Sequence, residues 1–574
     1  MVYALCMHID VVPNRNSRPA YLLRESYRDG KKVRKRTIAN LSALSDEQIA
    51  AFRAILAGQR LAPVESLFEI TGSRAHGHIE AVRVAMSRLG IAALLSARSS
   101  HERQLVCAML AARIAQPQTK LATTRWWHTT TLAEDFGVTD ATEDDLYAAM
   151  DWLLTRQDSI QKKLAARHLH NGNLVLYDLS SSYFEGSTCP LAQLGYSRDG
   201  KKGKPQVNYG VLTDRRGCPL AVAVHQGNTA DPQTLLPEIR RLRQDFGLTQ
   251  LVIVGDRGMI AQTGNDALRG QDGVGWITAL KSGAIRALMA QGGLQLGLFD
   301  ERNLFEFTHP DYPNERLVAC RNPELAARRA HKREDLLKAT EKNLAKVQAM
   351  VKAGRLRGQD KIGLRVGKVV DQYKVAKHFT LNIEDRAFSF RRQRESIATE
   401  AALDGIYVIR TSVPDTAMDS AECVRSYKAL AQVERAFRTL KSVDLRIRPI
   451  HHRLADRVRA HIFLCLLAYY VEWHLREAWR ELLFADTEIQ AKQARDPVAP
   501  AKRSAKAERK ATTQKLEDGT PAHSFTTLLQ ELSSIVCNTC CTPHAADGAQ
   551  TFEVVTTPNP KQRHALELAQ HIQV

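Results

Sequence analysis

The spacing of apolar residues changes along the chain and marks its regions. Residues 21–27 and 33–41 alternate between apolar and polar around Asp29-Gly30, a dipeptide typical of a tight turn, which predicts a β-hairpin. Ser45 and Gln48 have the spacing of a capping box and predict a helix over residues 46–56. From about 78 to 168, apolar residues recur every three or four positions, so helices are expected there.

Patterns typical of strands begin near residue 171. The expected strands are residues 174–184, 206–213, 219–225, 251–255 and 274–280. The expected helices are residues 231–246, with Asp231 as N-cap and Pro232 at N1, and residues 261–268. Three strands followed by helix, strand, helix and strand is the order of an RNase H-like sheet.

The segment 281–402 departs from this rhythm. It contains a charge-rich helix near 322–352 and strand candidates such as 379–383, and we interpret it as a β-rich insertion. A strand at 405–411 and helices at 421–441 and 456–480 resume the core. Residues 491–515 are rich in Lys, Arg, Ala and Pro and predict a flexible basic linker, followed by a short helix at 526–537.

The expected fold class is therefore α/β. It has an RNase H-like mixed sheet with flanking helices and a β-rich insertion, preceded by a β-hairpin and a helical N-terminal region. The expected domains are residues 1–60 (hairpin and helix, with possible DNA contact), 61–170 (helical accessory or DNA-binding domain), 171–280 and 403–484 (two parts of the catalytic core), 281–402 (insertion) and 485–574 (basic linker and tail).

The charge balance favours a polyanionic partner. Among 574 residues, Lys and Arg number 81 against 62 Asp and Glu, a net charge of +19. The longest apolar run, residues 462–471, is shorter than the ~20 residues of a membrane span. The N-terminus lacks the basic region of a signal peptide, so we expect a cytoplasmic, nucleoid-associated protein with reduced cysteines.

Basic residues crowd the return strand of the hairpin. Lys31, Lys35 and Arg36 are the DNA-binding candidates there, in a ribbon that suits a phosphate backbone. The alternative is a solvated strand face. Near the C-terminus, Cys537, Cys540 and Cys541 have metal-like spacing, but no second ligand pair follows at zinc-finger spacing, and small buried residues are the alternative.

Three acidic residues are the candidates for chemistry. Asp178 interrupts an apolar strand, Asp256 closes another, and Glu434 lies in the helix at 421–441. A charge among aliphatic residues needs a partner or a task. In an RNase H-like sheet the first and fourth strands are neighbours, so Asp178 and Asp256 converge. Two Mg²⁺ ions held between such carboxylates can activate a hydroxyl and stabilise the leaving oxygen.

The helix that carries Glu434 has a second pattern. Tyr427, Glu434 and Lys441 are spaced by seven residues and are expected on one face, beside an apolar stripe. This arrangement suits a metal site along a phosphate backbone, and an amphipathic helix with incidental charges is the alternative. There is no Walker A loop, HExxH or GxSxG motif, so nothing indicates ATP hydrolysis, zinc proteolysis or a serine nucleophile.

These motifs resemble the DDE transposases of bacterial insertion sequences, whose signature is Tyr-x2-Arg-x3-Glu-x6-Lys. Tyr427, Glu434 and Lys441 match it, whereas Leu430 stands in the Arg position. Arg425, Lys428 or Arg438 is the candidate to supply the missing phosphate contact. Further stretches are similar to family segments in the same order: residues 27–31, 176–180, 195–199, 227–231, 256–258 and 448–453. The residue types at 195 and 227–231 also suit loops and caps.

The resemblance implies that Asp178, Asp256 and Glu434 ligate two Mg²⁺ ions, with Mn²⁺ as a substitute. Tyr427 and Lys441 would contact the transposon-end strand. The implied reaction is cleavage at the inverted repeats and transfer of the 3′-hydroxyls into target DNA, by a homodimer that needs no ATP. An RNase H-like nuclease without strand transfer and a catalytically degenerate DNA-binding protein are the alternatives.

Overall fold

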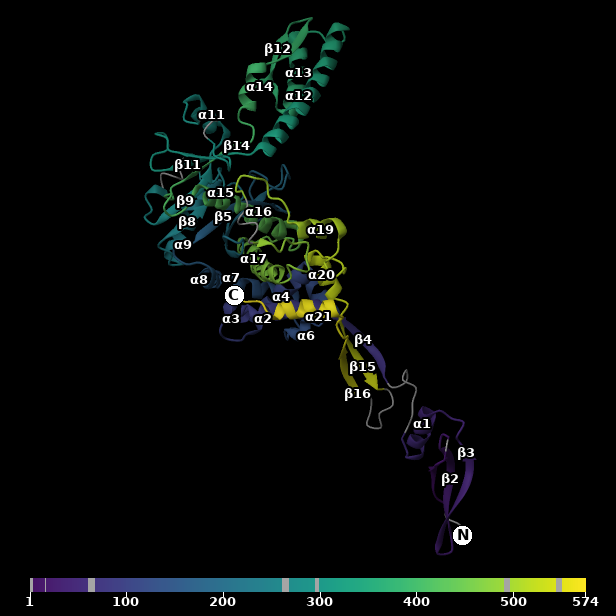
Figure 1. Cartoon of the computed structure of the whole chain (residues 1–574). Coiled ribbons are helices and arrows are strands. Elements are labelled where there is room, and N and C mark those ends of the chain that lie inside the picture. Colours follow the sequence, from purple (N-terminus) through teal and green to yellow (C-terminus); the bar gives the residue numbers. More distant parts are fainter. Residues whose placement is uncertain are drawn as a thin grey trace. The chain divides into compact units, whose positions relative to one another are not determined.

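The computed structural model describes residues 4–15, 17–59, 68–260, 268–294, 299–489, 496–542 and 550–573. The chain divides into two compact units (Figure 1). The first comprises Met1–Arg74 and Val536–Thr556, and the second comprises Ala75–Ile535 and Thr557–Val574.

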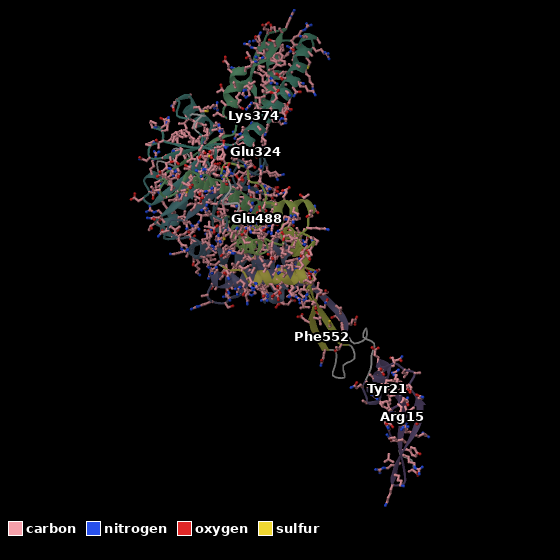
Figure 2. The ribbon with its side chains drawn as sticks, in the orientation of Figure 1. Arg15, Tyr21, Glu324, Lys374, Glu488 and Phe552 are labelled. Carbon is pink, nitrogen blue, oxygen red and sulfur yellow. The ribbon has the colours of Figure 1, made fainter. Side chains whose placement is uncertain are left out.

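The first unit contains the predicted hairpin. Strands β2 (Ala20–Asp29) and β3 (Lys32–Asn40) pair antiparallel, and β1 (Ala4–Val12), which was not predicted, adds a third strand beside β2. Helix α1 (Asp46–Leu56) begins with the predicted capping box of Ser45 and Gln48. Tyr21, labelled in Figure 2, lies on β2. The guanidinium groups of Arg18 and Arg53 lie 5.4 and 5.8 Å from the centre of its ring.

A second sheet in this unit accounts for the cysteines near the C-terminus. Its strands are β4 (Glu69–Ala75), β15 (Val536–Thr542) and β16 (Gln550–Val555). The helix predicted at 526–537 ends at Leu532 as α20 (Phe525–Leu532), and Cys537 and Cys540 are buried in β15. Burial within a strand agrees with the alternative of ordinary small residues.

The helical region predicted between 78 and 168 is confirmed. Its helices are α2 (Gly77–Arg88), α3 (Ile91–Leu95), α4 (His101–Ala115), α5 (Lys120–Trp126), α6 (Leu132–Asp135), α7 (Glu143–Leu154) and α8 (Gln157–His168). The almost fully buried helix α17 (Ala455–Ala478) packs against α4 and α7 and against the edge strand of the main sheet. Within the described part of the chain, no helix is long and apolar enough to cross a membrane.

The main sheet has the RNase H-like arrangement that the sequence predicted. Its strands are β5 (Leu174–Tyr183), β6 (Gln206–Asp214), β7 (Pro219–Gln226), β8 (Leu251–Val254), β9 (Val274–Ala279), β10 (Leu304–Phe307), β11 (Arg316–Arg321) and β14 (Ile406–Thr411). Their order is β10-β11-β14-β9-β8-β5-β6-β7. β5 is antiparallel to β6 and parallel to β8, so the first strand is central.

Two predicted helices need comment. Helix α9 (Asp231–Gln244) follows β7, but its N-cap is Ala230, so the prediction of Asp231 as N-cap is wrong and its carboxylate is free for another partner. The helix predicted at 261–268 falls almost entirely outside the described residues. Helix α11 (Ser282–Ala290) follows β9.

The segment 281–402 differs from the β-rich insertion that was predicted. Its strands β10 and β11 extend the main sheet, because β11 pairs with β14 across the insertion. The rest is mainly helical, with α12 (Pro323–Lys352), α13 (Gln359–Tyr373), the hairpin β12 (Phe379–Ile383) and β13 (Phe388–Arg392), and α14 (Arg394–Ala401). These elements share a hydrophobic core of their own, which includes Leu344 and Val366.

The expectation of a flexible linker at 491–515 is not met in its described part. Ser504 caps α19 (Ala505–Thr513) and donates to buried Asp486 at 2.7 Å. Lys510 donates to the carbonyls of Glu481 and Leu483 at 2.8 and 3.2 Å, so a polar side chain anchors a segment with few apolar residues. Helix α21 (Pro560–Gln570) then packs against α2 and α17.

The helix predicted at 421–441 is divided. Its parts are α15 (Ser420–Lys428), α16 (Leu430–Arg438) and a π-helical turn at Thr439–Val443. Ala429 and Thr439, where the parts meet, keep right-handed helical dihedrals, so the three parts follow one another directly.

Candidate active site

Asp178 and Asp256 occupy matching positions on neighbouring strands. Strands β5 and β8 pair in parallel with Leu176 opposite Val254. Two residues further along each chain, Asp178 is still in β5 and Asp256 has just left the end of β8. Parallel register therefore brings together two carboxylates that are far apart in sequence.

The surroundings of Asp178 make its negative charge costly without a cation. Burial, with a further contribution from Asp256, raises the pKa of Asp178 to about 7. The N–H of Leu179 donates to its Oδ1 at 2.8 Å and opposes this shift, as does the nearby Arg198. Asp256 is exposed. Two adjacent carboxylates, one of them half-buried, form an all-oxygen donor set of the kind Mg²⁺ prefers.

Tyr427 lies directly against Asp256. Its Oη donates to Oδ1 of Asp256 over 3.5 Å, a long hydrogen bond. Burial, together with Asp256, raises the pKa of the phenol, so it stays protonated and remains a donor at neutral pH. The end of α15 thus contributes a side chain to the two acids.

Helix α16 covers the face of the sheet that carries Asp178. The rings of Phe437 and Tyr209 are 5.9 Å apart, and Tyr209 lies opposite Ser180 in the β5–β6 register. Ser180 is two residues after Asp178, so both side chains point to the same face. Glu434, one turn before Phe437, is exposed and has no hydrogen bond or ion pair with any described residue.

The structure gives Lys441 a partner within the protein. It lies buried in the π-helical turn, and its Nζ is 3.0 Å from Oδ1 of Asp199. Arg448 pairs with the same carboxylate, which also accepts the N–H of Tyr183 at 3.1 Å. The shared helical face of Tyr427, Glu434 and Lys441 stays a prediction. Lys441 is held by Asp199 in the π-helical turn that follows α16.

Arg198 and Asp231 are near the acids and were not identified from the sequence. Arg198 pairs with Asp231 at 2.5 Å and lowers the pKa of Asp178 by its charge. Oδ2 of Asp231 and Oδ2 of Asp256 lie 4.0 and 3.9 Å from where a Cβ on Gly258 would be. The only sequence signal for this pair is that both residues lie in loops similar to family segments, since Asp231 resembles an ordinary cap.

Two glycines hold those loops together. A Cβ on Gly195 would lie 2.1 Å from the carbonyl oxygen of Gly227, and one on Gly227 would lie 1.9 Å from that of Gln206. Both distances are far below van der Waals contact, so only glycine fits. The loop-shaping interpretation of these positions therefore agrees with the packing.

Around Leu430, one of the three basic candidates remains unpaired. Leu430 is half-buried against the main hydrophobic core. Arg425 pairs with Glu422 at 3.1 Å, and Lys428 donates to backbone carbonyls, among them that of Val498 at 3.2 Å. Arg438 is exposed and has no partner among the described residues.

The basic strand of the hairpin is partly neutralised. Lys35 pairs with Asp10 at 2.9 Å and Arg36 with Glu25 at 2.6 Å, whereas Lys31 in the turn is exposed. Consecutive strand residues point to opposite faces, so Lys35 and Arg36 do not form one basic ribbon.

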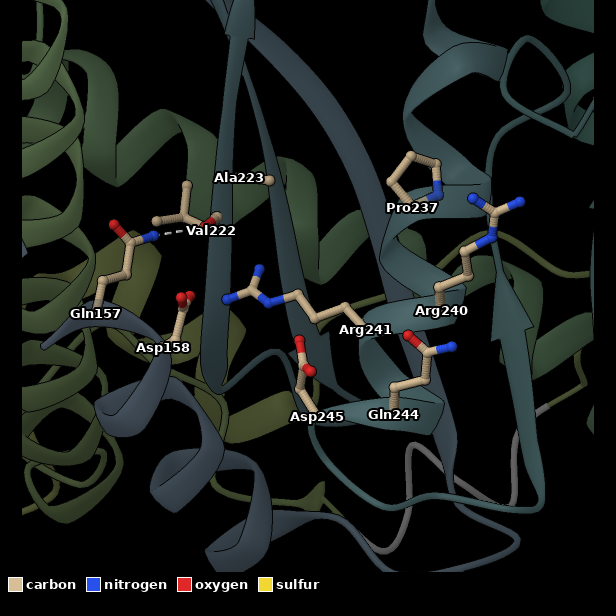
Figure 3. A pocket seen from close by; sticks show the side chains of 9 residues that line it. All are labelled: Gln157, Asp158, Val222, Ala223, Pro237, Arg240, Arg241, Gln244 and Asp245. Atoms are coloured by element: carbon tan, nitrogen blue, oxygen red, sulfur yellow. Dashed lines mark hydrogen bonds between the residues drawn. The ribbon is translucent and has the colours of Figure 1, made fainter. Parts of the chain in front are cut away.

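A pocket lies elsewhere in the second unit, between α8, β7 and α9 (Figure 3). Its volume is about 470 Å³, and its lining includes Asp158, Arg241 and Asp245. Gln157 donates to the carbonyl of Val222 at 3.1 Å across one side. It contains none of the three candidate acids.

Comparisons with known proteins identify the family. The family "Transposase DDE domain" matches residues 173–471, and the N-terminal domain of IS1634 family transposases matches residues 9–64. No curated protein gives a significant match. One similar solved structure is the synaptic complex of piggyBac transposase with hairpin DNA, at 6% identity and a TM-score of 0.33, covering 80% of this chain and 76% of that one. The DDE-domain match spans just over half of the length of this chain. The chain therefore belongs to the DDE-domain transposases of insertion sequences.

Proposed function

We propose that this transposase cleaves DNA at the ends of its element and joins the resulting 3′-hydroxyls to target DNA. The observation that carries the proposal is the pair Asp178 and Asp256, in register on adjacent strands, with Tyr427 against the second acid. Glu434 supplies a third carboxylate from the helix that covers the same face of the sheet. Three carboxylates on one face of the sheet suit phosphodiester chemistry.

Asp178, Asp256 and Glu434 would hold two Mg²⁺ ions, with Mn²⁺ as a substitute. The bound ions would activate the attacking hydroxyl and stabilise the leaving oxygen. Asp178 loses its proton when a cation neutralises the pair, and Tyr427 fixes the orientation of Asp256. The exposed Glu434 carboxylate has no competing partner among the described residues, so it is free to turn toward the site.

The remaining basic residues position the DNA. Arg438, exposed on the helix of Glu434, takes the phosphate contact that Leu430 cannot make. Lys441 forms an ion pair with Asp199. This pair holds the π-helical turn after α16 against the 195–199 loop, which also carries Arg198. The partners are transposon-end DNA with its inverted repeats and nucleoid target DNA, bound by a homodimer. Lys31, Lys35 and Arg36 add phosphate contacts from the hairpin.

The test mixes purified protein with Mg²⁺, a labelled duplex that ends in the element's inverted repeat, and a supercoiled target plasmid. We expect a nicked end and a product in which the labelled 3′-end is joined to the plasmid. Glu434→Gln should abolish both products and keep DNA binding, whereas Glu488→Gln, an acid outside the site, should keep both activities. Cleavage without joining would identify a nuclease, and binding without cleavage would identify a degenerate DNA-binding protein.

A further inference from the structure

A second group of metal-ligating side chains lies outside the acidic site. His168, Cys218 and His474 each offer one ligand atom, and these three atoms lie within 4.8 Å of one another. His168 ends α8, Cys218 immediately precedes β7, and His474 lies near the end of α17. The three residues therefore join the helical region, the edge of the catalytic sheet and the central buried helix.

The cluster is enclosed and its geometry is already close. Sγ of Cys218 is 3.9 Å from Nε2 of His474, and the two histidine rings are 5.8 Å apart. The Cys218 side chain is fully buried, and Tyr470 closes one side, with its Oη 2.9 Å from Nε2 of His168. With metal–ligand bonds of about 2.3 Å to sulfur and about 2.1 Å to nitrogen, ligands on a tetrahedral ion lie roughly 3.3–3.8 Å apart. Even the longest separation needs to shorten by no more than about 1–1.5 Å.

The turn that carries Cys218 is anchored by a neighbouring acid. The N–H of Cys218 donates to Oδ1 of Asp214 at 2.9 Å, which fixes the cysteine backbone.

Two cations, Arg216 and Arg167, lie close to the cluster, and the charge of Arg216 is compensated. Arg216 approaches Nδ1 of His168 to 3.5 Å, but its guanidinium pairs with Asp214 at 2.9 Å. The pair is electrically neutral, so it does not exclude a further cation. The same pair places the Asp214 carboxylate close to His168.

We propose that His168, Cys218 and His474 bind one Zn²⁺ ion, which ties α8 to the β6–β7 turn and to α17. Two imidazoles and a thiol are a soft donor set that suits zinc, in contrast to the carboxylates that suit Mg²⁺. As the zinc–sulfur bond forms, the thiol proton leaves to solvent. The ion has a structural role, and the proposal stands whether or not the chain cleaves DNA.

The test measures metal content and coordination in the full chain. Protein equilibrated with Zn²⁺ and dialysed should retain one zinc per chain by elemental analysis. Cys218→Ser and His474→Gln should lose it, whereas Cys465→Ser, which changes another fully buried cysteine on α17, should keep it. Cobalt-loaded protein should show a thiolate-to-cobalt charge-transfer band that is lost in Cys218→Ser and His474→Gln and kept in Cys465→Ser.

Several outcomes decide the proposal. Wild-type protein that retains no zinc, or Cys218→Ser protein that retains as much as wild type, overturns it and leaves a thiol hydrogen-bonded to a histidine. Where Cys218→Ser does not fold, the wild type alone decides: the cobalt band must appear and Zn²⁺ must displace it. Glu434→Gln should retain the zinc, which separates this site from the catalytic acids.

Discussion

The Oη of Tyr427 lies 3.5 Å from Oδ1 of Asp256, across 171 residues of sequence. Tyr427→Phe keeps the ring in place and removes this donor. We expect cleavage at the element end to slow about fivefold, because a long hydrogen bond to a carboxylate contributes about 1 kcal/mol. Single-turnover cleavage assays measure the change. Tyr196→Phe, at a ring that is 80% exposed, is the control, and equal rates for both variants would show that Tyr427 does not orient the acid.

Asp178→Asn should stabilise the metal-free protein and abolish cleavage. Since the folded-state pKa of about 7 is raised above the usual 3.8, the stability contribution of Asp178 is full below about pH 4 and is lost as pH rises through 7. At pH 8 we expect the variant to gain about 2 kcal/mol in free energy of unfolding. Urea denaturation with and without Mg²⁺ tests this, and the ion should protect only the wild type. An Asn variant that is less stable at pH 8 would contradict the assigned cost of the charge.

The Asp199–Lys441 pair should act as a structural unit. Asp199→Ala leaves the buried Lys441 and the half-buried Arg448 without their counterion, and we expect a loss of about 3–5 kcal/mol in unfolding free energy. The double variant Asp199→Asn/Lys441→Met should recover part of the loss, since no lysine charge is then left behind. If Lys441→Met instead weakens DNA binding without a change in stability, its main contact is a DNA phosphate.

Glu472 should make the stability of the central helix depend on pH. It is fully buried in α17 near Asp444, and burial raises its pKa to about 8 even though Arg476 donates to it at 2.6 Å. A carboxyl raised in this way supplies stability below about pH 4.5 and loses it as pH rises through 8. Glu472→Gln should therefore match the wild type near pH 5 and exceed it by about 1–2 kcal/mol near pH 9. Parallel pH dependence in the two proteins would argue against a protonated Glu472.

Alanine substitutions at Gly227 and Gly363 compare a tightly packed glycine with one that has free space around it. Gly227→Ala should destabilise the protein by about 3 kcal/mol or more and weaken the hold on Arg198, because backbone oxygen occupies the site of the new Cβ. Gly363→Ala, within α13 and with no atom near its Cβ, should raise stability by about 0.5–1 kcal/mol. Thermal denaturation compares the two, and a tolerated Gly227→Ala would mean that the 195–199 and 227–231 loops are not tightly packed.

The sequence by itself predicted most of the elements of the catalytic sheet and the candidate acids. Hydrophobic alternation, turn residues and caps are local signals, so the β5–β9 strand order and the capped helix α1 were predictable. The motif spacing identified Tyr427 as a residue of the site. The composition of residues 491–515 predicted a flexible linker, but part of this segment forms helix α19. Polar contacts of Ser504 and Lys510 anchor this helix, which has no large apolar stripe.

Only the tertiary structure decided what each charge contacts. Strand register brings Asp178 next to Asp256. The packing of the 195–199 loop against the 227–231 loop brings Asp231 near these acids, with Gly258 close to the carboxylates of Asp231 and Asp256. The same packing pairs Lys441 with Asp199 in the π-helical turn. Electrostatic and hydrogen-bond partners depend on distances of a few ångströms between residues that are distant in sequence, and no pattern along the chain encodes those distances.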